Sequence, residues 1–208
     1  MSNDQTTQTG TISGSLRTLA QVFAIVTPYA STEKAALQLV RITGNVFECC
    51  DSYAAIRHTD NSETTTTTPA AFTLPASEIS KALTAAAKLA GKRAGDVTAT
   101  ITATPERWTL NTNWDQTISG TNPQHETPNT AAIWATAQTT TPATFEPFSI
   151  AQWQIERLAK TTKQTSTGND QPATLTHYSS PIKPVIYTIS APNSETQLLI
   201  MPTKPRNQ

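Results

Sequence analysis

The feature that most constrains the fold of this sequence is a repeated order of elements, in which a helix is followed by antiparallel strands. The order occurs three times, at a loose period of about 55 to 80 residues and without a residue-level repeat. The expected helices are residues 15–28, 78–90 and 150–163. The expected strands are residues 36–42, 46–56, 72–75, 97–103, 108–114, 174–178, 184–190 and 197–201. Three such modules predict a pseudo-symmetric α+β architecture rather than one irregular domain.

Apolar periodicity and terminal residues indicate where the helices lie. The first helix starts at Ser15 and stops at Pro28, and its apolar stripe is Leu16, Leu19, Phe23 and Val26. Ala76 and Ser77 can cap the second helix, and Gly91 falls where it would end. Its apolar stripe is Ile79, Leu83, Ala86 and Ala90. In the third helix the inward positions are Ile150, Trp153 or Gln154, and Leu158.

The segments outside these modules are expected to be irregular. Residues 1–13 are polar and rich in threonine, so we expect a disordered tail. Residues 61–69 are of low complexity and are most simply a surface loop. Residues 120–128 form a connector rich in proline.

Composition excludes several classes of protein. The chain has 208 residues, of which 37% are hydrophobic and 14% charged, enough apolar content for a core in one or two domains. No window approaches the roughly 18 consecutive apolar residues of a membrane span. The first residues have neither the basic region nor the apolar core of a secretory signal. We therefore expect a cytoplasmic protein with no membrane partner.

The sequence offers little support for catalysis or metal binding. Glu48 and Asp51 are isolated carboxylates, and neither a phosphate-binding glycine loop nor a nucleophile elbow occurs. Cys49 and Cys50 are adjacent, so in a strand they point to opposite faces and are poorly placed to bridge one another. Two buried free thiols are the simplest interpretation. The sequence thus predicts a protein that is not an enzyme and has no metal or cofactor.

Basic residues recur on the expected helices. Lys81, Lys88 and Lys92 are spaced by seven and four residues, so they share one helix face. The full set is Arg17, Lys81, Lys88, Lys92, Arg93, Arg157, Lys160 and Lys163. A solvated helix surface is the ordinary explanation. The functional alternative is that the helices line one surface and present these cations to nucleic-acid phosphates. The net charge of zero argues against a basic surface all round but allows a local basic face.

Three stretches, taken in order, resemble the bacterial DNA polymerase III sliding clamp, the beta subunit. VFECCDSYAAI at 46–56 resembles the clamp segment that ends in an Ala-Thr-Asp-Gly/Ser-aromatic-Arg-Leu-Ala signature. FTLPASEISKAL at 72–83 resembles the strand, proline and helix that follow it. SPIKPVI at 180–186 and QLLIMP at 197–202 are similar to the closing strands of the family, which end in a Met-Pro motif.

The resemblance implies an α+β fold of DNA-clamp-like repeats. Residues 14–121 would correspond to the middle clamp domain and residues 122–208 to a shortened C-terminal domain, while the N-terminal domain of the family has no counterpart in this sequence. It further implies a DNA replication processivity factor that is a homo-oligomer and binds double-stranded DNA without sequence specificity. Its protein partners would be a DNA polymerase or other proteins with clamp-binding motifs.

The resemblance also implies a peptide-binding pocket, which in the family lies between the middle and C-terminal domains. By motif matching, one wall is Cys50, Ser52, Tyr53 and Ala55. The other wall is Ile182, Pro184, Leu199, Met201 and Pro202. Ordinary core packing is the alternative for Leu199 and Met201.

Two departures from the family pattern bear on this pocket. Ala54 stands where the family has arginine, and the chain continues past the Met-Pro motif. The alternative function is therefore a peptide-binding module or decoy that keeps the pocket but does not encircle DNA. An unrelated structural protein of α+β type is a third alternative.

Overall fold

The computed structural model describes residues 9–62, 64–67, 71–123, 125, 130–138, 148–165, 172–178 and 183–203 of the chain. These residues form two antiparallel sheets, with helices packed against them. The α+β class and the repeated order of helix and strands that the sequence predicts are confirmed.

Two units of the same order, a strand, a helix and three strands, make up the N-terminal part of the chain. The first consists of β1 (Gly10–Ser15), α1 (Leu16–Val26), β2 (Leu39–Thr43), β3 (Val46–Cys50) and β4 (Ala54–Asp60). The second consists of β6 (Phe72–Pro75), α2 (Ala76–Ala90), β7 (Thr98–Ala103), β8 (Arg107–Thr112) and β9 (Thr117–Thr121). The short strand β5 (Thr65–Thr66) lies between the units, and 3-10 turns occur at η1 (Thr27–Tyr29), η2 (Ala35–Leu37) and η3 (Gly91–Gly95).

A third unit with one helix and three strands follows. It consists of α4 (Gln152–Thr165), β10 (Thr174–His177), β11 (Val185–Ala191) and β12 (Ser194–Ile200). A further helix, α3 (Thr130–Gln138), lies between β9 and this unit along the chain. Ser149, just before α4, forms an isolated antiparallel bridge with Thr203, just after β12. The bridge ties the two ends of the third unit together.

The first two units exchange their first strands. β1 pairs with β7 of the second unit, and β6 pairs with β2 of the first. The first sheet therefore has the order β5-β1-β7-β8-β9. Because each helix follows a strand of one sheet and leads to strands of the other, the exchange joins the two units into one body.

The second sheet joins the third unit to the first, in the order β10-β11-β12-β4-β3-β2-β6. β12 pairs with β4 along its full length, from Ser194 opposite Asp60 to Ile200 opposite Ala54. This antiparallel pair joins the third unit to the first.

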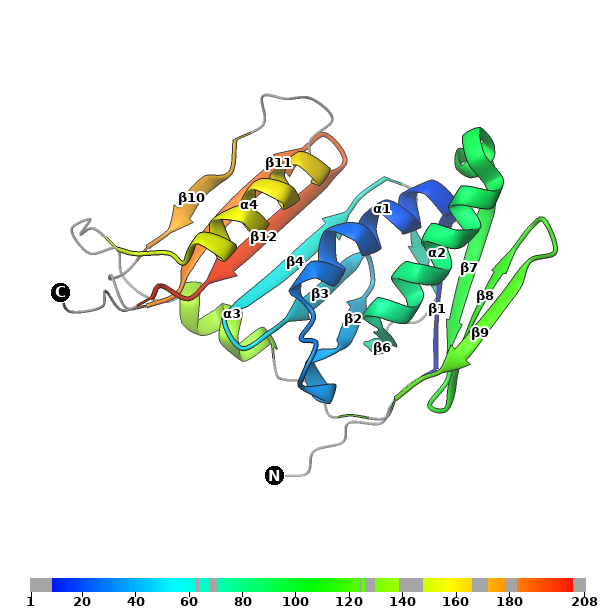
Figure 1. The fold of residues 1–208 in the computed structure, drawn as a ribbon, viewed down its shortest axis with the longest axis horizontal. Coiled ribbons are helices and arrows are strands. Elements are labelled where there is room, and N and C mark those ends of the chain that lie inside the picture. Colours follow the sequence, from blue (N-terminus) through cyan, green and yellow to red (C-terminus); the bar gives the residue numbers. More distant parts are fainter. Residues whose placement is uncertain are drawn as a thin grey trace.

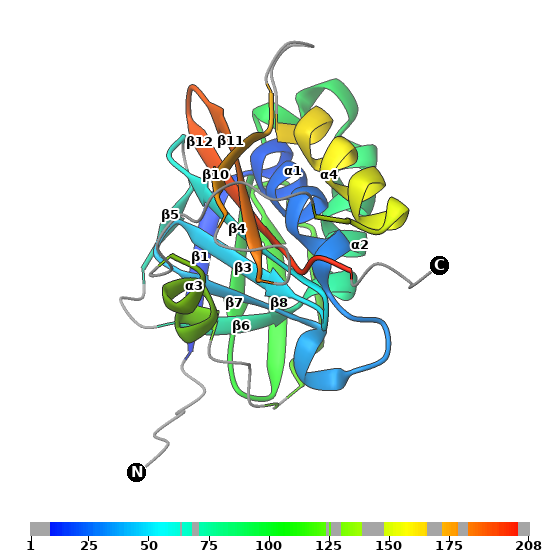
Figure 2. The same ribbon diagram turned by 90° about the vertical axis from the view of Figure 1, so that its left-hand side faces the viewer.

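Three helices cover one side of the sheets and one helix covers the other. α1 lies between α2 and α4 and packs against both (Figure 1). The side view places α1, α2 and α4 together on one side of the strands, and α3 on the opposite side (Figure 2). The three helices that carry the predicted basic residues therefore share one face of the molecule.

α1 begins and ends where the sequence predicts. The hydroxyl of Ser15 accepts a hydrogen bond from the backbone N–H of Thr18 at 3.1 Å, which caps the helix. Pro28 lies in the 3-10 turn that follows. The whole predicted apolar stripe is buried. Phe23 packs edge to face against Phe47 of β3, with ring centroids 6.0 Å apart.

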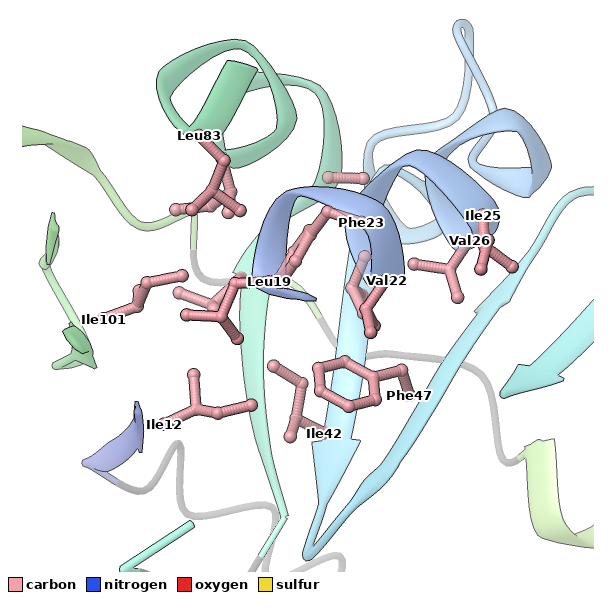
Figure 3. Packing of buried hydrophobic residues seen from close by; sticks show 14 of the residues in the cluster. Ile12, Leu19, Val22, Phe23, Ile25, Val26, Ile42, Phe47, Leu83 and Ile101 are labelled. Carbon is pink, nitrogen blue, oxygen red and sulfur yellow. The ribbon is translucent and has the colours of Figure 1, made fainter. Parts of the chain in front are cut away.

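The main core lies between these helices and both sheets. Figure 3 shows side chains of α1 and α2 meeting residues from strands of each sheet, with Ile12 and Ile101 on one side and Ile42 and Phe47 on the other. Each of these four side chains is fully buried. One continuous core therefore supports both sheets and fixes the two helices on them.

α2 buries its predicted stripe and ends at the predicted glycine. Gly91 has φ 56° and ψ −128°, a backbone conformation that only glycine adopts without strain. The start of the helix differs from the prediction. Its capping position is Pro75, which makes no side-chain hydrogen bond, and the helix already begins at Ala76.

Two segments that were expected to be irregular contain strands. The predicted tail of residues 1–13 is wrong for residues 10–13, which belong to β1 and are anchored by the fully buried Ile12. Residues 1–8 lie outside the described part of the chain. In the predicted loop at 61–69, β5 pairs with β1 and adds an edge strand to the first sheet.

One expected strand is interrupted. The run predicted at 46–56 breaks between β3 and β4. The Asp51 carboxylate accepts hydrogen bonds from the backbone N–H groups of Tyr53 and Ala54, at 2.7 and 2.8 Å, and so closes a tight turn. The two halves of the run are therefore neighbouring antiparallel strands.

Two further elements, β9 and α3, are absent from the sequence prediction. β9 has a single large apolar residue, Ile118. Its last residues, from Gly120 on, fall in the connector that the sequence predicts at 120–128. A Cβ atom at Gly120 would lie 2.7 Å from the indole of Trp108, so this strand position requires glycine. α3 buries only Thr130, Trp134 and Ala137, which gives it no clear apolar stripe.

The inner face of α4 is polar. Gln154, Thr161 and Thr165 are buried, whereas Trp153 is 40% exposed, so of the two alternatives that the sequence left open Gln154 is correct. The Gln154 side-chain amide donates hydrogen bonds to the backbone carbonyls of Tyr53 and Met201, at 3.4 and 3.3 Å. α4 is thus attached to the sheet largely by hydrogen bonds.

Candidate functional site

The three helices that share one face concentrate positive charge there. Together with η3 they carry eight of the fifteen basic residues of the chain, but only two carboxylates, Glu78 and Glu156. Because the net charge of the chain is zero, all other segments together are acidic. The exposed cations of this face are Arg17, Lys81, Lys88, Lys92, Arg93, Lys160 and Lys163. We refer to these seven residues as the basic face.

Arg17 also has a structural contact. Its guanidinium donates a hydrogen bond to the backbone carbonyl of Lys92 at 2.9 Å. The contact links α1 to η3 and holds the short turn with Lys92 and Arg93 beside the first helix. The Arg17 side chain itself stays exposed where α1 meets η3.

Arg157 does not belong to this face, although the sequence placed it there. Its guanidinium pairs with the Asp51 carboxylate at 2.6 Å and donates to the carbonyl of Pro28. It also lies over the rings of Tyr29 and Trp153, at 4.9 and 5.1 Å from their centroids. These contacts commit the charge of Arg157 to joining α4 to the first unit, so we leave Arg157 out of the basic face, and its phosphate contact stays a prediction.

A buried pair of hydroxyl groups also joins α4 to the first unit. The phenol of Tyr29, which is 1% exposed, lies 3.0 Å from the hydroxyl of Thr161 on α4. Burial raises the pKa of Tyr29 to about 12. The phenol therefore stays neutral and keeps its hydrogen bond with Thr161. This hydrogen bond helps to fix α4 against the first unit.

The two walls of the predicted peptide pocket meet in the structure. Cys50 lies opposite Ala55, and Ala55 lies opposite Leu199, across the adjacent strands β3, β4 and β12. Beyond the strand ends, the backbone N–H of Met201 donates to the carbonyl of Tyr53 at 3.0 Å. Motif matching therefore brought together residues that are neighbours in space.

The exposed part of this junction is apolar and aromatic. Tyr53 is 60% exposed and Met201 38% exposed, and the ring of Trp153 packs edge to face on Tyr53 at 5.8 Å. The remaining predicted wall residues differ in environment. Ser52 is exposed and accepts a hydrogen bond from Lys34, Pro184 and Pro202 are partly buried, and Ile182 lies outside the described residues.

The other part of the junction is covered by α3. Cys50, Ala55 and Leu199 form one apolar cluster with Ile186 of β11 and with Trp134 and Ala137 of α3. All six residues are buried. We call this cluster the α3 site. It lies on the face of the second sheet opposite α1 and α4 (Figure 2).

The two cysteines confirm this division into faces. Both are free and buried, as the sequence predicts. Cys49 belongs to the main core, whereas its neighbour Cys50 belongs to the α3 site. Burial, together with the carboxylates of Asp51 and Glu48, raises the pKa of the Cys50 thiol to about 11.

Trp134 is the residue of α3 that sequence reasoning missed. It is 1% exposed, and the guanidinium of Arg57 lies 4.8 Å above its ring. Arg57 in turn pairs with Glu48 at 2.9 Å, and Glu48 also accepts a hydrogen bond from Thr130 at 2.9 Å. The available signal was a tryptophan within TAAIWATAQ, a run without glycine or proline that follows the connector rich in proline.

A pocket of about 230 Å³, lined by both polar and apolar side chains, lies between α1, the end of β4 and the β11–β12 turn. His58 lines it and is hydrogen-bonded to Thr196 at 2.8 Å, and burial lowers the pKa of His58 to about 4. Asp60 also lines it, but its carboxylate accepts hydrogen bonds from Ser62 and Thr64. These hydrogen bonds give both titratable residues, His58 and Asp60, a structural role.

Two further kinds of feature are absent from the described residues. No group of three or more His, Cys, Asp or Glu side chains is placed there to hold a metal ion. No helix in this part of the chain is long and apolar enough to cross a membrane.

Comparison with known proteins gives matches of structure only. No protein-family model and no curated protein matches the sequence. The DNA polymerase sliding clamp from Caulobacter crescentus is 13% identical with a TM-score of 0.65, over 98% of this chain and 67% of that one. The beta subunit from DNA polymerase of Streptococcus pyogenes is 12% identical with a TM-score of 0.55, over 92% and 65%.

A structure that contains PCNA is also similar in fold. A structure of the C-terminal region of FEN-1 bound to A. fulgidus PCNA matches at 9% identity and a TM-score of 0.58, over 95% of this chain and 100% of that one. The chain thus has the fold of the DNA sliding clamps, as the resemblance predicted. It spans about two thirds of the length of the bacterial clamps, at 67% and 65% in the two cases above.

Proposed function

We propose that this chain, which has the sliding-clamp fold, is a DNA-replication processivity factor without enzymatic activity. It associates with duplex DNA through its basic face and docks partner peptides at the junction of β4 and β12. Partners are a DNA polymerase or other proteins that carry clamp-binding motifs, and the protein acts in the cytoplasm.

The observation that carries this proposal is the charge of the helical face. Seven exposed cations lie on three helices and a 3-10 turn on one side of a chain whose net charge is zero. Contacts between such cations and phosphates are independent of sequence and sensitive to salt. A face of this kind suits a protein that must bind any duplex and move along it.

Peptide docking is supported by the exposed aromatic and methionine side chains next to β12. Tyr53, Trp153 and Met201 present apolar surface at the point where the two predicted walls meet. Methionine and aromatic side chains adapt to apolar anchors of different shapes. The site therefore suits short peptides with an apolar anchor.

Association into a homo-oligomer is proposed through the open sheet edges. In the described part of the chain β9 ends one sheet and β10 ends the other, so each has backbone groups on one side that another strand can pair with. β4 is not available for this purpose, because β3 and β12 occupy both of its sides. Light scattering measures the number of copies.

The decisive experiment compares two charge-reversed double variants. One carries Lys81→Glu and Lys160→Glu on the basic face, and the matched control carries Arg107→Glu and Lys183→Glu, which are exposed elsewhere. Both pairs change the net charge equally. Binding to a labelled duplex is measured by fluorescence anisotropy over a series of salt concentrations.

The proposal predicts weaker binding for the first variant, with the slope of log affinity against log salt smaller by about 2, roughly one for each lost phosphate contact. The control should behave like the wild type. Equal losses in both variants would show that net charge alone, and not this face, attracts DNA. Retention on nicked circles, with release on linearisation, then tests encirclement.

The second candidate function is a peptide-binding module that does not encircle DNA. The pairing of β4 with β12 within one chain favours this function. The pairing keeps the peptide junction, and it occupies a strand edge of β4 that another copy of the chain would otherwise be able to pair with. A strict monomer that binds peptides and is not retained on circular DNA would establish this function instead.

A further inference from the structure

α3 covers part of the junction that the proposed function assigns to partner peptides. Three of the predicted wall residues, Cys50, Ala55 and Leu199, are buried in the α3 site. Tyr53 and Met201, at the adjoining strand ends, remain exposed. The chain therefore fills one half of the junction with its own helix and leaves the other half open.

The described apolar contacts that hold α3 come mainly from one side chain, beside the hydrogen bond of Thr130 to Glu48. Of its nine residues only Thr130, Trp134 and Ala137 are buried, and Ile133 is 39% exposed. A helix of nine residues is marginal in water without tertiary contacts. Since Trp134 has by far the largest of the three buried side chains, the apolar docking of α3 depends chiefly on this residue.

The fit of Trp134 is incomplete. Its ring is buried beneath the Arg57 guanidinium, but its indole N–H has no hydrogen-bond acceptor within the described structure. A buried donor without a partner lowers the net gain from docking. The site thus accepts an apolar aromatic side chain well and its N–H group poorly.

Release of α3 would leave the strand pairings intact. Before it, β9 is held by β8, and after it Ser149 is bridged to Thr203. The cluster beneath α3 is separate from the main core, which holds Cys49 on the other face of the same strand. α3 can therefore leave the sheet without unfolding the body of the protein.

We propose that α3 is an intramolecular occupant of the peptide junction, and that a partner peptide with an apolar anchor binds the α3 site by displacing it. This inference rests on the proposed peptide docking and adds its regulation. In the resting state the helix blocks the half of the junction formed by Cys50, Ala55, Ile186 and Leu199. A partner gains access only by competing with Trp134.

Cys50 is a built-in reporter of α3, because it is the cysteine in the α3 site. Native protein is treated with N-ethylmaleimide, and the modified cysteine is identified by mass spectrometry. In the wild type both thiols should react slowly, since both are buried. Trp134→Ala should accelerate the reaction of Cys50 by about tenfold or more while Cys49 stays protected, because only the local opening becomes easier.

Two controls make the result specific. Trp134→Phe keeps an aromatic anchor and removes the unpaired N–H, so Cys50 should stay at least as protected as in the wild type. Ala137→Asp perturbs α3 at a second buried position and should again expose Cys50 alone. If α3 is an integral part of the fold, both disruptive variants will expose Cys49 together with Cys50, or neither thiol, and the proposal is overturned.

A peptide in trans tests the competition directly. A fluorescein-labelled peptide of residues 130–138, TAAIWATAQ, should bind the Trp134→Ala protein about tenfold or more tightly than the wild type, because the attached helix no longer competes. It should also restore the protection of Cys50. Equal affinity for the two proteins would contradict displacement.

The results separate this inference from the proposed function. A wild-type protein that does not bind duplex DNA would refute the DNA role, and the Cys50 response would be unaffected. Normal duplex binding with a Cys50 that does not respond to Trp134→Ala would refute displacement of α3 alone.

Discussion

Lowering the pH from 7 to 5 should destabilise this protein through one residue, His58. The imidazole is 2% exposed, and its Nδ1 atom lies 2.8 Å from the Thr196 hydroxyl. Burial lowers its pKa from 6.5 to about 4, although the nearby Asp60 carboxylate partly opposes this shift. Between these two pKa values the unfolded chain binds a proton that the folded chain does not bind.

The sign and the size of the effect follow from this difference. Stability falls as the pH decreases below 6.5, and the loss is complete below pH 4. With the two pKa values above, the loss in unfolding free energy between pH 7 and pH 5 is about 2 kcal/mol. This amount is a substantial part of the 5–15 kcal/mol typical of globular domains.

The test compares the wild type with His58→Asn, which keeps a polar group near Thr196 but does not titrate. Urea unfolding is followed by circular dichroism at pH 7 and pH 5. The wild type should lose about 2 kcal/mol more than the variant, which moves its urea midpoint down by about 1 M relative to the variant. Because the two proteins differ only at position 58, the difference between their losses isolates this residue. Equal losses in the two proteins would refute the assignment of this pH dependence to His58.

Three further substitutions test contacts that position the helices. Tyr29→Phe should lower the unfolding free energy by about 1–2 kcal/mol in urea titrations, because the Thr161 hydroxyl loses its buried partner. Arg157→Met should cost about 2–4 kcal/mol because Asp51 loses its ion pair, and adding Asp51→Asn should recover part of the loss in a double-mutant cycle. Gly91→Ala should lower the thermal midpoint by a few degrees, corresponding to about 1–3 kcal/mol, because alanine is strained at φ 56°. A Gly91→Ala protein as stable as the wild type would contradict the last expectation.

The sequence predicted best those elements whose apolar pattern is strong. α1 and α2 carry stripes that the core buries completely, and their ends are marked by Ser15 and Gly91. β9 and α3 were missed because their large apolar residues are too few to show a period. The inner face of α4 could not be read with certainty, since its buried positions are polar and pair with specific partners.

The candidate site was predictable where it depends on position along a strand or helix. Cys50, Ala55 and Leu199 are adjacent because strand order and register bring them together. The role of Arg157 could not be predicted, because its partner Asp51 lies 106 residues away in sequence. The covering of this junction by Trp134 likewise depends on tertiary packing, and no local pattern encodes it.

The pairing of β4 with β12 also affects how the chain folds during synthesis. Ala54 pairs with Ile200 and Asp60 pairs with Ser194, so the edge of β4 remains open until residues 194–200 have been made. Pairings this distant in sequence slow folding, and an open strand edge is prone to join other chains. Arg57, His58 and Asp60 place ionisable groups on this edge, which reduces that hazard while the nascent chain waits for its partner strand.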